Sequence, residues 1–437
     1  MANAVQMVAV RVVAAVVSNF SGNELKRSLK PMAGLCFFCH NDGMELTLRE
    51  KVVYWSLSGF FLIALFNPLF KKYDYGAGFP LVLLFAVMMV VFALLFWRER
   101  REKAILELAF LGIFGIFIVS SFVFSGTKNI GLSEVMAFLS VILFYLFFGL
   151  RRSGWMHKFV GVIKVMTVLA VFLGFVLYFV WPEVRMQGPF FNLFYHSNVW
   201  PNAFALYLLM TWPLFLNESR AKVAILALIF AAILLTFSRG ALIVLAGQFL
   251  LVLLYNLRRI NRRKIVIVGL TFLLTAGVFL GANALRAMKY EVVDVEERAT
   301  FANSESLTSK QERIDFWLGA IKLAGEKPLF GWGPYSFRYA YNPIQKTFLG
   351  SADHPHNIFL KIASENGVIA LGAFLAFLLV YVWTLAKRFK GLDEEKRNTA
   401  YLLFVAIAGA FAHNLIDYNF NFSVNLFLLF FILAYLR

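Results

Sequence analysis

Charged residues are scarce in this chain, and acidic residues are the scarcer kind. Of its 437 residues, 15% are charged, whereas an average soluble domain carries about 25%. Hydrophobic residues make up 60% of the chain, which also contains 50 Phe and 9 Trp. This composition excludes an ordinary soluble domain and favours a protein whose helices face lipid, with aromatic residues at the membrane interfaces.

Cysteine is nearly absent, since Cys36 and Cys39 are the only two. This excludes a framework of disulfides. Both cysteines belong to CFFCH at residues 36–40, which matches the C-x-x-C-H pattern of covalent haem attachment. A haem domain needs a soluble segment around the motif, and none of that size is present, so we interpret the match as chance. Residues 1–43 are interpreted as an extension without structural consequence or a misassigned start, because Met44 opens a more natural membrane-protein sequence.

Negative charge is outweighed by a net charge of +17, which could indicate a nucleic-acid partner. The basic residues, however, are concentrated in short loops between apolar runs. That distribution is typical of membrane proteins whose topology is set by Lys and Arg on the cytoplasmic side. We therefore exclude nucleic acid and expect the bilayer itself to be a partner.

Long apolar runs are what the chain has in abundance. Only helices can satisfy their backbone groups inside lipid, and the alternation typical of membrane barrels is absent. The sequence thus predicts an all-α polytopic membrane protein with about twelve transmembrane helices. The predicted segments are 51–70, 79–97, 104–124, 132–150, 158–181, 200–216, 221–237, 240–257, 264–282, 364–386, 399–416 and 420–436.

The loop charges predict the orientation. With a cytoplasmic N-terminus, the inner short loops hold 19 Lys and Arg and the outer short loops hold 5. Both termini are then cytoplasmic, and the chain divides into nine helices in residues 44–282, a large periplasmic loop at 283–360 and three helices in 361–437. The polar segments 182–200, 238–240 and 413–421 fall on the same face as this loop.

The large loop is predicted to contain an amphipathic helix. Ser309 and Glu312 have the spacing of a capping box, so the helix should begin there, with Arg313 in its first turn. Apolar residues follow at helical spacing until Gly325 and Pro328 end the helix. We expect it to lie on the bilayer surface or to cap the bundle. Arg313 is either a solvated, snorkelling side chain or a functional one.

Arg239 stands between two apolar runs in LLTFSRGALIVL, with almost no loop around it. An arginine so close to the hydrocarbon costs about 0–3 kcal/mol unless it snorkels or finds a partner. It can snorkel to the headgroups, or its guanidinium can hold phosphate oxygens bidentately. Gly240 would then let a ligand approach the backbone.

DHPHNIF, at the end of the large loop, contains His354, His356 and Asn357. A histidine at the membrane surface can act as a general base, because its ordinary pKa is about 6.5. The alternatives are a hydrogen-bonded loop histidine and a metal ligand, although H-x-H with Asp353 is an incomplete ligand set. Asn357 can cap the helix that follows.

Two other outer segments carry polar groups. HNLIDYNFN at 413–421 contains His413, Asn414 and Asp417, which can support the site or merely cap and pack helices. The 182–200 loop mixes Arg185 and Asn198 with aromatic residues. These aromatics are either membrane anchors or the lining of a path for an isoprenoid tail.

LTFSRGA, QERIDFWLGAIKLAGEKPLFGWGPYSF and HPHNIFLKIASENGVIAL, in this order, resemble the O-antigen ligase and O-antigen polymerase superfamily. The motifs cover about residues 180–370, and the twelve-helix plan with one large external loop extends the resemblance over 51–437. It implies a glycosyltransferase of the bacterial inner membrane with a periplasmic active site. The donor would be glycan on undecaprenyl diphosphate, without a metal or nucleotide cofactor.

The resemblance also implies roles for individual residues. Arg239 and Arg313 would bind the diphosphate, and His356 would activate the hydroxyl of the acceptor. We expect Arg185, Asn198, His354 and Asn357 to contribute to substrate binding. Two arginines in a water-poor site can neutralise a departing diphosphate without Mg²⁺.

The acceptor remains open at this point. A ligase transfers glycan to the lipid A core oligosaccharide, which we favour, a polymerase extends another carrier-linked glycan, and some relatives glycosylate pilins. A transporter of lipid-linked sugar is the alternative from another class. The internal repeats and mid-membrane polar groups typical of transporters are not found in the sequence.

Overall fold

The structure is a computed structural model. It describes residues 46–66, 79–96, 104–149, 154–180, 185–186, 199–216, 222–292, 304–345 and 352–437. These residues form helices and connecting turns, without a strand. The helical prediction is therefore confirmed for the described part of the chain. The CFFCH motif and Asn198 lie outside the described residues.

Each of the twelve apolar segments corresponds to a helix. The first nine are α3 (Leu48–Phe66), α4 (Phe79–Phe96), α5 (Ile105–Phe124), α6 (Lys128–Phe144) with the π-helical turn η1 (Tyr145–Gly149), α7 (Gly154–Val180), α8 (Val199–Thr211) with η2 (Trp212–Phe215), α9 (Lys222–Leu235), α10 (Arg239–Asn256) with η3 (Leu257–Arg259), and α11 (Arg262–Ala287). The last three are α16 (Val368–Phe389), α17 (Glu394–Asn414) and α18 (Ser423–Leu436).

Six helices among the described residues are long and apolar enough to cross a bilayer on their own, which makes this a membrane protein. They are Ile105–Phe124, Gly131–Gly149, Gly154–Val180, Arg239–Asn256, Arg262–Ala287 and Val368–Phe389. The apolar helices Lys222–Leu235 and Ser423–Leu436 are shorter. A total of twelve spans stays a prediction.

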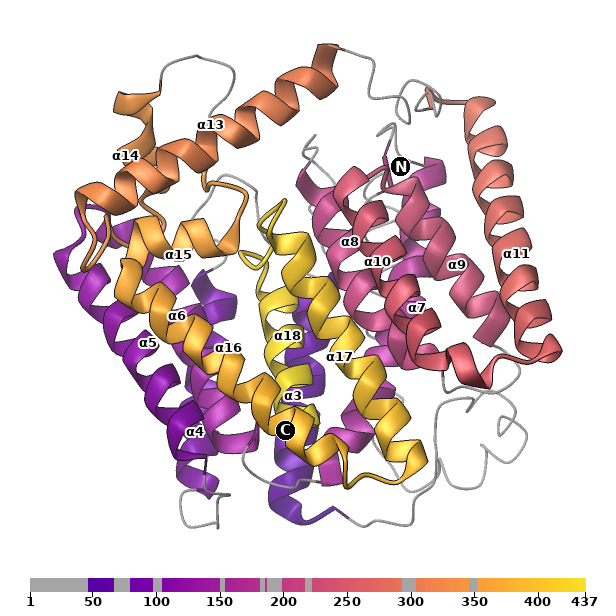
Figure 1. The fold of residues 1–437 in the computed structure, drawn as a ribbon, viewed down its shortest axis with the longest axis horizontal. Coiled ribbons are helices and arrows are strands. Elements are labelled where there is room, and N and C mark those ends of the chain that lie inside the picture. Colours follow the sequence, from indigo (N-terminus) through magenta and orange to yellow (C-terminus); the bar gives the residue numbers. More distant parts are fainter. Residues whose placement is uncertain are drawn as a thin grey trace. The chain divides into compact units, whose positions relative to one another are not determined.

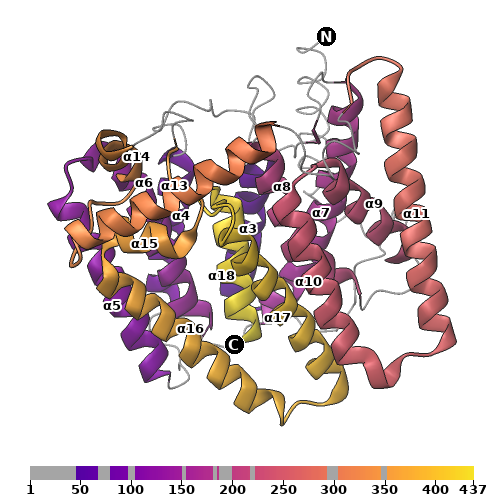
Figure 2. The same cartoon turned by 45° about the horizontal axis from the view of Figure 1, so that its top comes forward.

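The segment between α11 and α16 also folds into helices. They are α13 (Ser304–Glu326), α14 (Phe337–Tyr341), η4 (Asn342–Ile344) and α15 (Ile358–Asn366). Within the unit Leu46–Arg437, α13 lies crosswise to most of the long helices and packs on α15 and α14 (Figures 1 and 2). The prediction of a helix that caps one end of the bundle agrees with this arrangement.

The predicted start of α13 is wrong. The helix begins at Ser304, so Ser309 and Glu312 lie inside it and Arg313 is in its third turn. The segment SESLTSKQERID contains no Gly or Pro. The helix can therefore start several residues before Ser309. The predicted end at Gly325 agrees with the observed end at Glu326.

Helix α13 has two apolar faces. Phe316, Ala320 and Leu323 pack into a small core with residues of α14. Leu318 and Ile321, on the face predicted from the sequence, are exposed. The inward face was missed because it includes small residues, Gly319 and Ala320, that carry little hydrophobic signal.

The tenth predicted segment starts too early. Residues 364–366 belong to α15, and α16 begins at Val368 after a break at Gly367. Gly367 has φ +91°, and a Cβ there would lie 2.1 Å from the carbonyl oxygen of Leu329. The Val368 amide instead donates to the Pro328 carbonyl at 2.8 Å. Only glycine permits this close approach of the turn after α13.

Helices α10 and α17 pack against each other, and α17 also packs on α8 and α18. The start of α10 lies beside the end of α17, because Gly240 faces the Ile416 side chain at 3.6 Å from a built Cβ. The other ends of the two helices meet where Tyr255 donates to the Asn398 side chain at 2.8 Å. The two helices are therefore antiparallel. The predicted site residues gather at the end where α10 begins and α17 ends.

Candidate active site

His356 and Asp417 form the centre of the candidate site. Asp417 Oδ1 lies 2.7 Å from His356 Nδ1, across 61 residues of sequence. The Asp417 side chain is buried, whereas the His356 side chain is 21% exposed. With an ionised aspartate at Nδ1, the proton of a neutral imidazole lies on Nδ1 and leaves Nε2 as an acceptor. Among the described residues, Nε2 has no hydrogen-bond partner.

A chain of hydrogen bonds holds the aspartate from behind. Asn202, in the first turns of α8, donates from Nδ2 to Asp417 Oδ2 at 2.6 Å. Its Oδ1 accepts from Arg185 Nη2 at 2.9 Å. Arg185 is buried, and its Nε donates to the Thr236 carbonyl at 2.7 Å. Both carboxylate oxygens of Asp417 are thus fixed in position.

The backbone at His356 is set by the helix that follows it. Asn357 caps α15, because its Oδ1 accepts from the amides of Phe359 at 2.9 Å and Leu360 at 3.1 Å. Its Nδ2 donates to the Leu415 carbonyl at 3.1 Å, which ties the cap to the turn after α17. His356 itself has φ +54°, a conformation that costs a non-glycine residue about 1–2 kcal/mol. The predicted cap is confirmed.

Helix α13 contributes two residues of one face to the site. The Phe316 ring stacks on the His356 ring, with centroids 5.8 Å apart and an interplanar angle of 19°. Arg313 is partly buried, and its Nε donates to the Ile416 carbonyl at 3.2 Å. Residues three apart lie on the same helix face, so Arg313 and Phe316 approach the site together. Arg313 is therefore held against the turn after α17, and the choice between a snorkelling and a functional side chain stays a prediction.

Arg239 begins α10 beside the same turn. Ser238 caps the helix by accepting from the Ala241 amide at 3.4 Å, and Arg239 is partly buried. The next residue, Gly240, faces Ile416, and Thr236 receives Arg185. The SRG turn therefore lies beside the turn that carries Asp417. The residue two positions before it, Thr236, contacts Arg185, the arginine that donates to Asn202.

His354 is buried beneath His356. The His354 Nδ1 accepts from the His356 amide at 3.4 Å, and the two rings meet edge to face at 4.8 Å. Burial lowers the pKa of His354 well below 6.5, and the neighbouring His356 lowers it further. His354 is thus neutral in this geometry, and its expected part in substrate binding stays a prediction.

The Asp417 carboxylate stays ionised. Burial would raise its pKa, but the hydrogen bond from His356 and favourable electrostatic interactions with His356, His413 and Arg313 hold the pKa below its ordinary range. The folded structure therefore keeps an acceptor at His356 Nδ1 at neutral pH. This charge can stabilise the imidazolium that forms when Nε2 takes a proton.

A buried ionic cluster is centred on α15, the helix that follows the loop with His354 and His356. Lys361 Nζ lies 2.9 Å from the Glu134 carboxylate of α6 and also pairs with Glu365. Glu365 accepts from the Tyr335 amide at 3.0 Å and the Phe337 amide at 3.1 Å. The cluster thereby fastens the turn between α13 and α14 to α15. It holds the segments that carry Arg313 and His356.

The structure gathers most of the residues predicted from the sequence. Arg185, Arg313, His354, His356 and Asn357 lie in one hydrogen-bonded and stacked assembly, and Arg239 lies beside it.

Sequence reasoning missed other residues. It missed Asn202 and Lys361, and it left Asp417 between a supporting and a capping role. Lys361 could have been noticed as a lone charge among apolar residues, whereas Asn202 offers no such signal.

The described residues contain no group of three His, Cys, Asp or Glu side chains arranged as metal ligands. The two loop histidines instead contact each other, and His356 pairs with Asp417. The arrangement offers one acceptor nitrogen beside two arginine-bearing turns. It can take a proton from a hydroxyl next to a bound anion.

Residues 223–375 match the model of the family described as O-antigen ligase (Wzy_C). The match covers Arg239, Arg313 and His356 and confirms the resemblance to the O-antigen ligase and polymerase superfamily. Asn202 and Asp417 lie on either side of the matched range. Among proteins with a curated function, none matches this chain.

Proposed function

We propose that this protein transfers glycan from an undecaprenyl-diphosphate carrier to a sugar hydroxyl of the lipid A core oligosaccharide. The observation that carries the proposal is the bond of 2.7 Å between His356 Nδ1 and Asp417 Oδ1. It leaves Nε2 as the base and supplies a charge behind it. The family match supports a membrane enzyme of the O-antigen ligase or polymerase type.

In the proposed reaction, the acceptor hydroxyl oxygen attacks C1 of the donor sugar at the reducing end of the glycan. The bond from C1 to the diphosphate oxygen breaks, and its electron pair leaves with undecaprenyl diphosphate. The hydroxyl proton passes to His356 Nε2, and Asp417 stabilises the resulting imidazolium. Solvent then removes this proton.

Arg239 and Arg313 are assigned to the diphosphate. A departing diphosphate gains negative charge, which fixed guanidinium groups can stabilise in a site that excludes water. A guanidinium also presents two parallel donors to a pair of phosphate oxygens, which lysine does not. Arg239→Lys and Arg313→Lys should therefore both lower transfer despite keeping the charge, and wild-type rates in both would contradict the assignment.

The proposed function is tested with purified protein in detergent and the carrier-linked glycan as donor. Two acceptors are offered separately, namely rough lipopolysaccharide and a second carrier-linked glycan, and a chelator is present throughout. Modification of the lipopolysaccharide supports the ligase. Elongation of the carrier-linked glycan makes the protein a polymerase, and bound donor without transfer to either acceptor reopens transport and protein acceptors.

The proposed periplasmic placement of the site has its own test. Leu318 on α13 is 60% exposed, so a cysteine there should not disturb the fold. In a chain with Cys36 and Cys39 replaced by Ser, Leu318→Cys should react in intact spheroplasts with a membrane-impermeant maleimide. Labelling only after the membrane is disrupted would overturn the orientation.

A further inference from the structure

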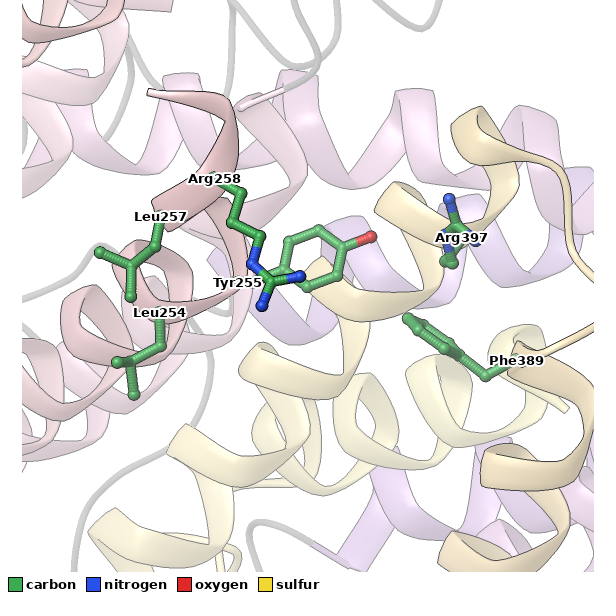
Figure 3. A pocket seen from close by; sticks show the side chains of 6 residues that line it. All are labelled: Leu254, Tyr255, Leu257, Arg258, Phe389 and Arg397. Atoms are coloured by element: carbon green, nitrogen blue, oxygen red, sulfur yellow. The ribbon is translucent and has the colours of Figure 1, made fainter. Parts of the chain in front are cut away.

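A cavity of about 450 Å³ lies at the end of the α10–α17 pair that is remote from His356. Its lining comprises Leu254, Tyr255, Leu257, Arg258, Phe389 and Arg397. Figure 3 shows Tyr255 and Arg258 on the side of α10 and η3, with Phe389 and Arg397 facing them from α16 and α17. The two most basic short loops of the sequence, RRINRRK and AKRFKGLDEEKRN, thus meet at one cavity.

The guanidinium groups of the two arginines of this cavity, Arg258 and Arg397, have no hydrogen-bond or ion-pair partner among the described residues. None of the described residues that line the cavity carries a carboxylate. Asp393, just before α17, is already engaged, because it accepts from the Lys396 amide at 2.9 Å and from Lys396 Nζ at 2.7 Å. The cavity therefore has unmet positive charge.

Tyr255, which lies between the two arginines, is held in place by residues of α17. Tyr255 stacks on Tyr401 with centroids 4.0 Å apart and planes 10° apart, and its hydroxyl donates to the Asn398 side chain. The Tyr401 hydroxyl donates to the Leu251 carbonyl at 2.8 Å. These contacts join α10 to α17, so a ligand would find this wall of the cavity already ordered.

An exposed apolar strip leads away from the cavity along α10. From Leu254 in the cavity wall, which is 53% exposed, it continues through Leu253 and Leu250, which are 48% and 54% exposed. Helix α10 has 18 residues, which corresponds to about 27 Å between its ends. This is close to the thickness of the hydrocarbon core, so the cavity lies at the membrane interface opposite the His356 site.

We propose that this cavity binds the phosphate of an anionic glycerophospholipid. Arg258 and Arg397 supply the countercharge for the phosphodiester, Tyr255 and Phe389 enclose the headgroup, and the leucines of α10 contact the acyl chains. A basic pocket between transmembrane helices at the cytoplasmic face is the kind of site that takes such a headgroup. An uncharged lipid would leave both guanidinium groups without a partner.

The experiment uses the full chain in detergent and counts bound lipids by native mass spectrometry. Phosphatidylglycerol and phosphatidylcholine with identical acyl chains are titrated separately, and inorganic phosphate and undecaprenyl phosphate are added in further titrations. The variants are Arg258→Gln alone and Arg258→Gln with Arg397→Gln. The matched control is Arg262→Gln with Arg263→Gln, which removes the same charge from exposed positions outside the cavity.

Phosphatidylglycerol should bind in preference to phosphatidylcholine, and the double variant should weaken that binding by about thirtyfold, from two lost arginine contacts. The single variant should have a smaller effect in the same direction, and the control should bind like wild type.

Equal binding of the two phospholipids, or an unchanged affinity in the double variant, would overturn the proposal. It would also be overturned if inorganic phosphate displaced phosphatidylglycerol at equal concentration, or if undecaprenyl phosphate bound more tightly.

Discussion

Lys361 and His356 lie close together in the chain, and the ionic assemblies that they form with their carboxylate partners differ in whether a hydrogen-bonding group is left for a substrate. Lys361 is enclosed by Glu134 and Glu365, and its side chain is 2% exposed. His356 is paired with a single carboxylate, and its side chain is 21% exposed. The lysine has no remaining capacity for a substrate, whereas the histidine keeps one ring nitrogen. The comparison separates a group that holds structure from a group that can react.

The surroundings of the two assemblies support this difference. Of the two carboxylates around Lys361, Glu365 also accepts the backbone amides of Tyr335 and Phe337. The carboxylate beside His356 accepts one further side chain, Asn202, whose other partner is Arg185. The first assembly therefore joins segments of backbone, and the second orients side chains. Each can be disturbed separately.

The largest expected effect on stability follows from Lys361→Met. The substitution leaves two buried carboxylates facing each other without a cation, which costs about 3–5 kcal/mol. The control is Lys322→Met, which breaks another lysine–glutamate pair four residues apart, in this case an exposed one on α13. That pair contributes about 0.3–0.5 kcal/mol. Thermal unfolding in detergent should show a large drop for Lys361→Met and almost none for the control.

Asp417→Asn should affect transfer more than stability. The amide keeps the shape of the side chain but no longer stabilises the positive charge on His356, so transfer should fall about a hundredfold. Asp353→Asn is the matched control, because Asp353 forms a partly exposed pair with Arg338 at 3.1 Å. Equal transfer by the two variants would show that the charge of Asp417 is not used.

Part of the site's geometry could be predicted from the sequence. Arg239, Arg313 and His356 could be singled out because each stands in a short motif that resembles the family pattern, and the structure places them near one another, while their roles stay predictions. Asn202 could not be singled out, because it contacts a residue 215 positions away and its own surroundings are an apolar helix. Its role depends on how α8 packs against α17 and α18, which local periodicity does not encode.

Helix boundaries show the same limit. The apolar runs predict which segments are helical, but they do not contain the break at Gly367, which depends on contact with the turn at Leu329. The capping pattern at Ser309 is a real local signal that the longer helix overrides. Local chemistry therefore predicts the elements, and packing between distant segments decides their ends and their partners.

Asn202→Ala should have a smaller effect on transfer than Asp417→Asn. It removes one donor to Asp417 and the acceptor of Arg185, but the bond from His356 to Asp417 remains. We expect transfer to fall about tenfold and stability to fall by about 1–3 kcal/mol, from two buried polar groups left without partners. Wild-type transfer in a folded Asn202→Ala protein would show that the hydrogen bonds from Arg185 through Asn202 to Asp417 are not needed for transfer.

The smallest expected effect concerns pH and His354. Because burial lowers the pKa of His354 in the folded protein, the unfolded chain takes up a proton below pH 6.5 that the folded chain does not. Stability should therefore fall by about 1 kcal/mol between pH 6.5 and 5.5 in the wild type. This part of the pH dependence should be absent from His354→Gln, as measured by unfolding midpoints. An equal slope in both proteins would contradict a neutral, buried His354.

The role of His356 as the base of a transfer reaction is tested most directly by measuring donor binding and transfer in the same preparation. His356→Ala should bind the carrier-linked glycan like wild type and transfer it at least about a hundredfold more slowly. His157→Ala, which alters a histidine bonded to Tyr435 away from the site, should match wild type in both measurements. Undiminished transfer by folded His356→Ala would contradict the account.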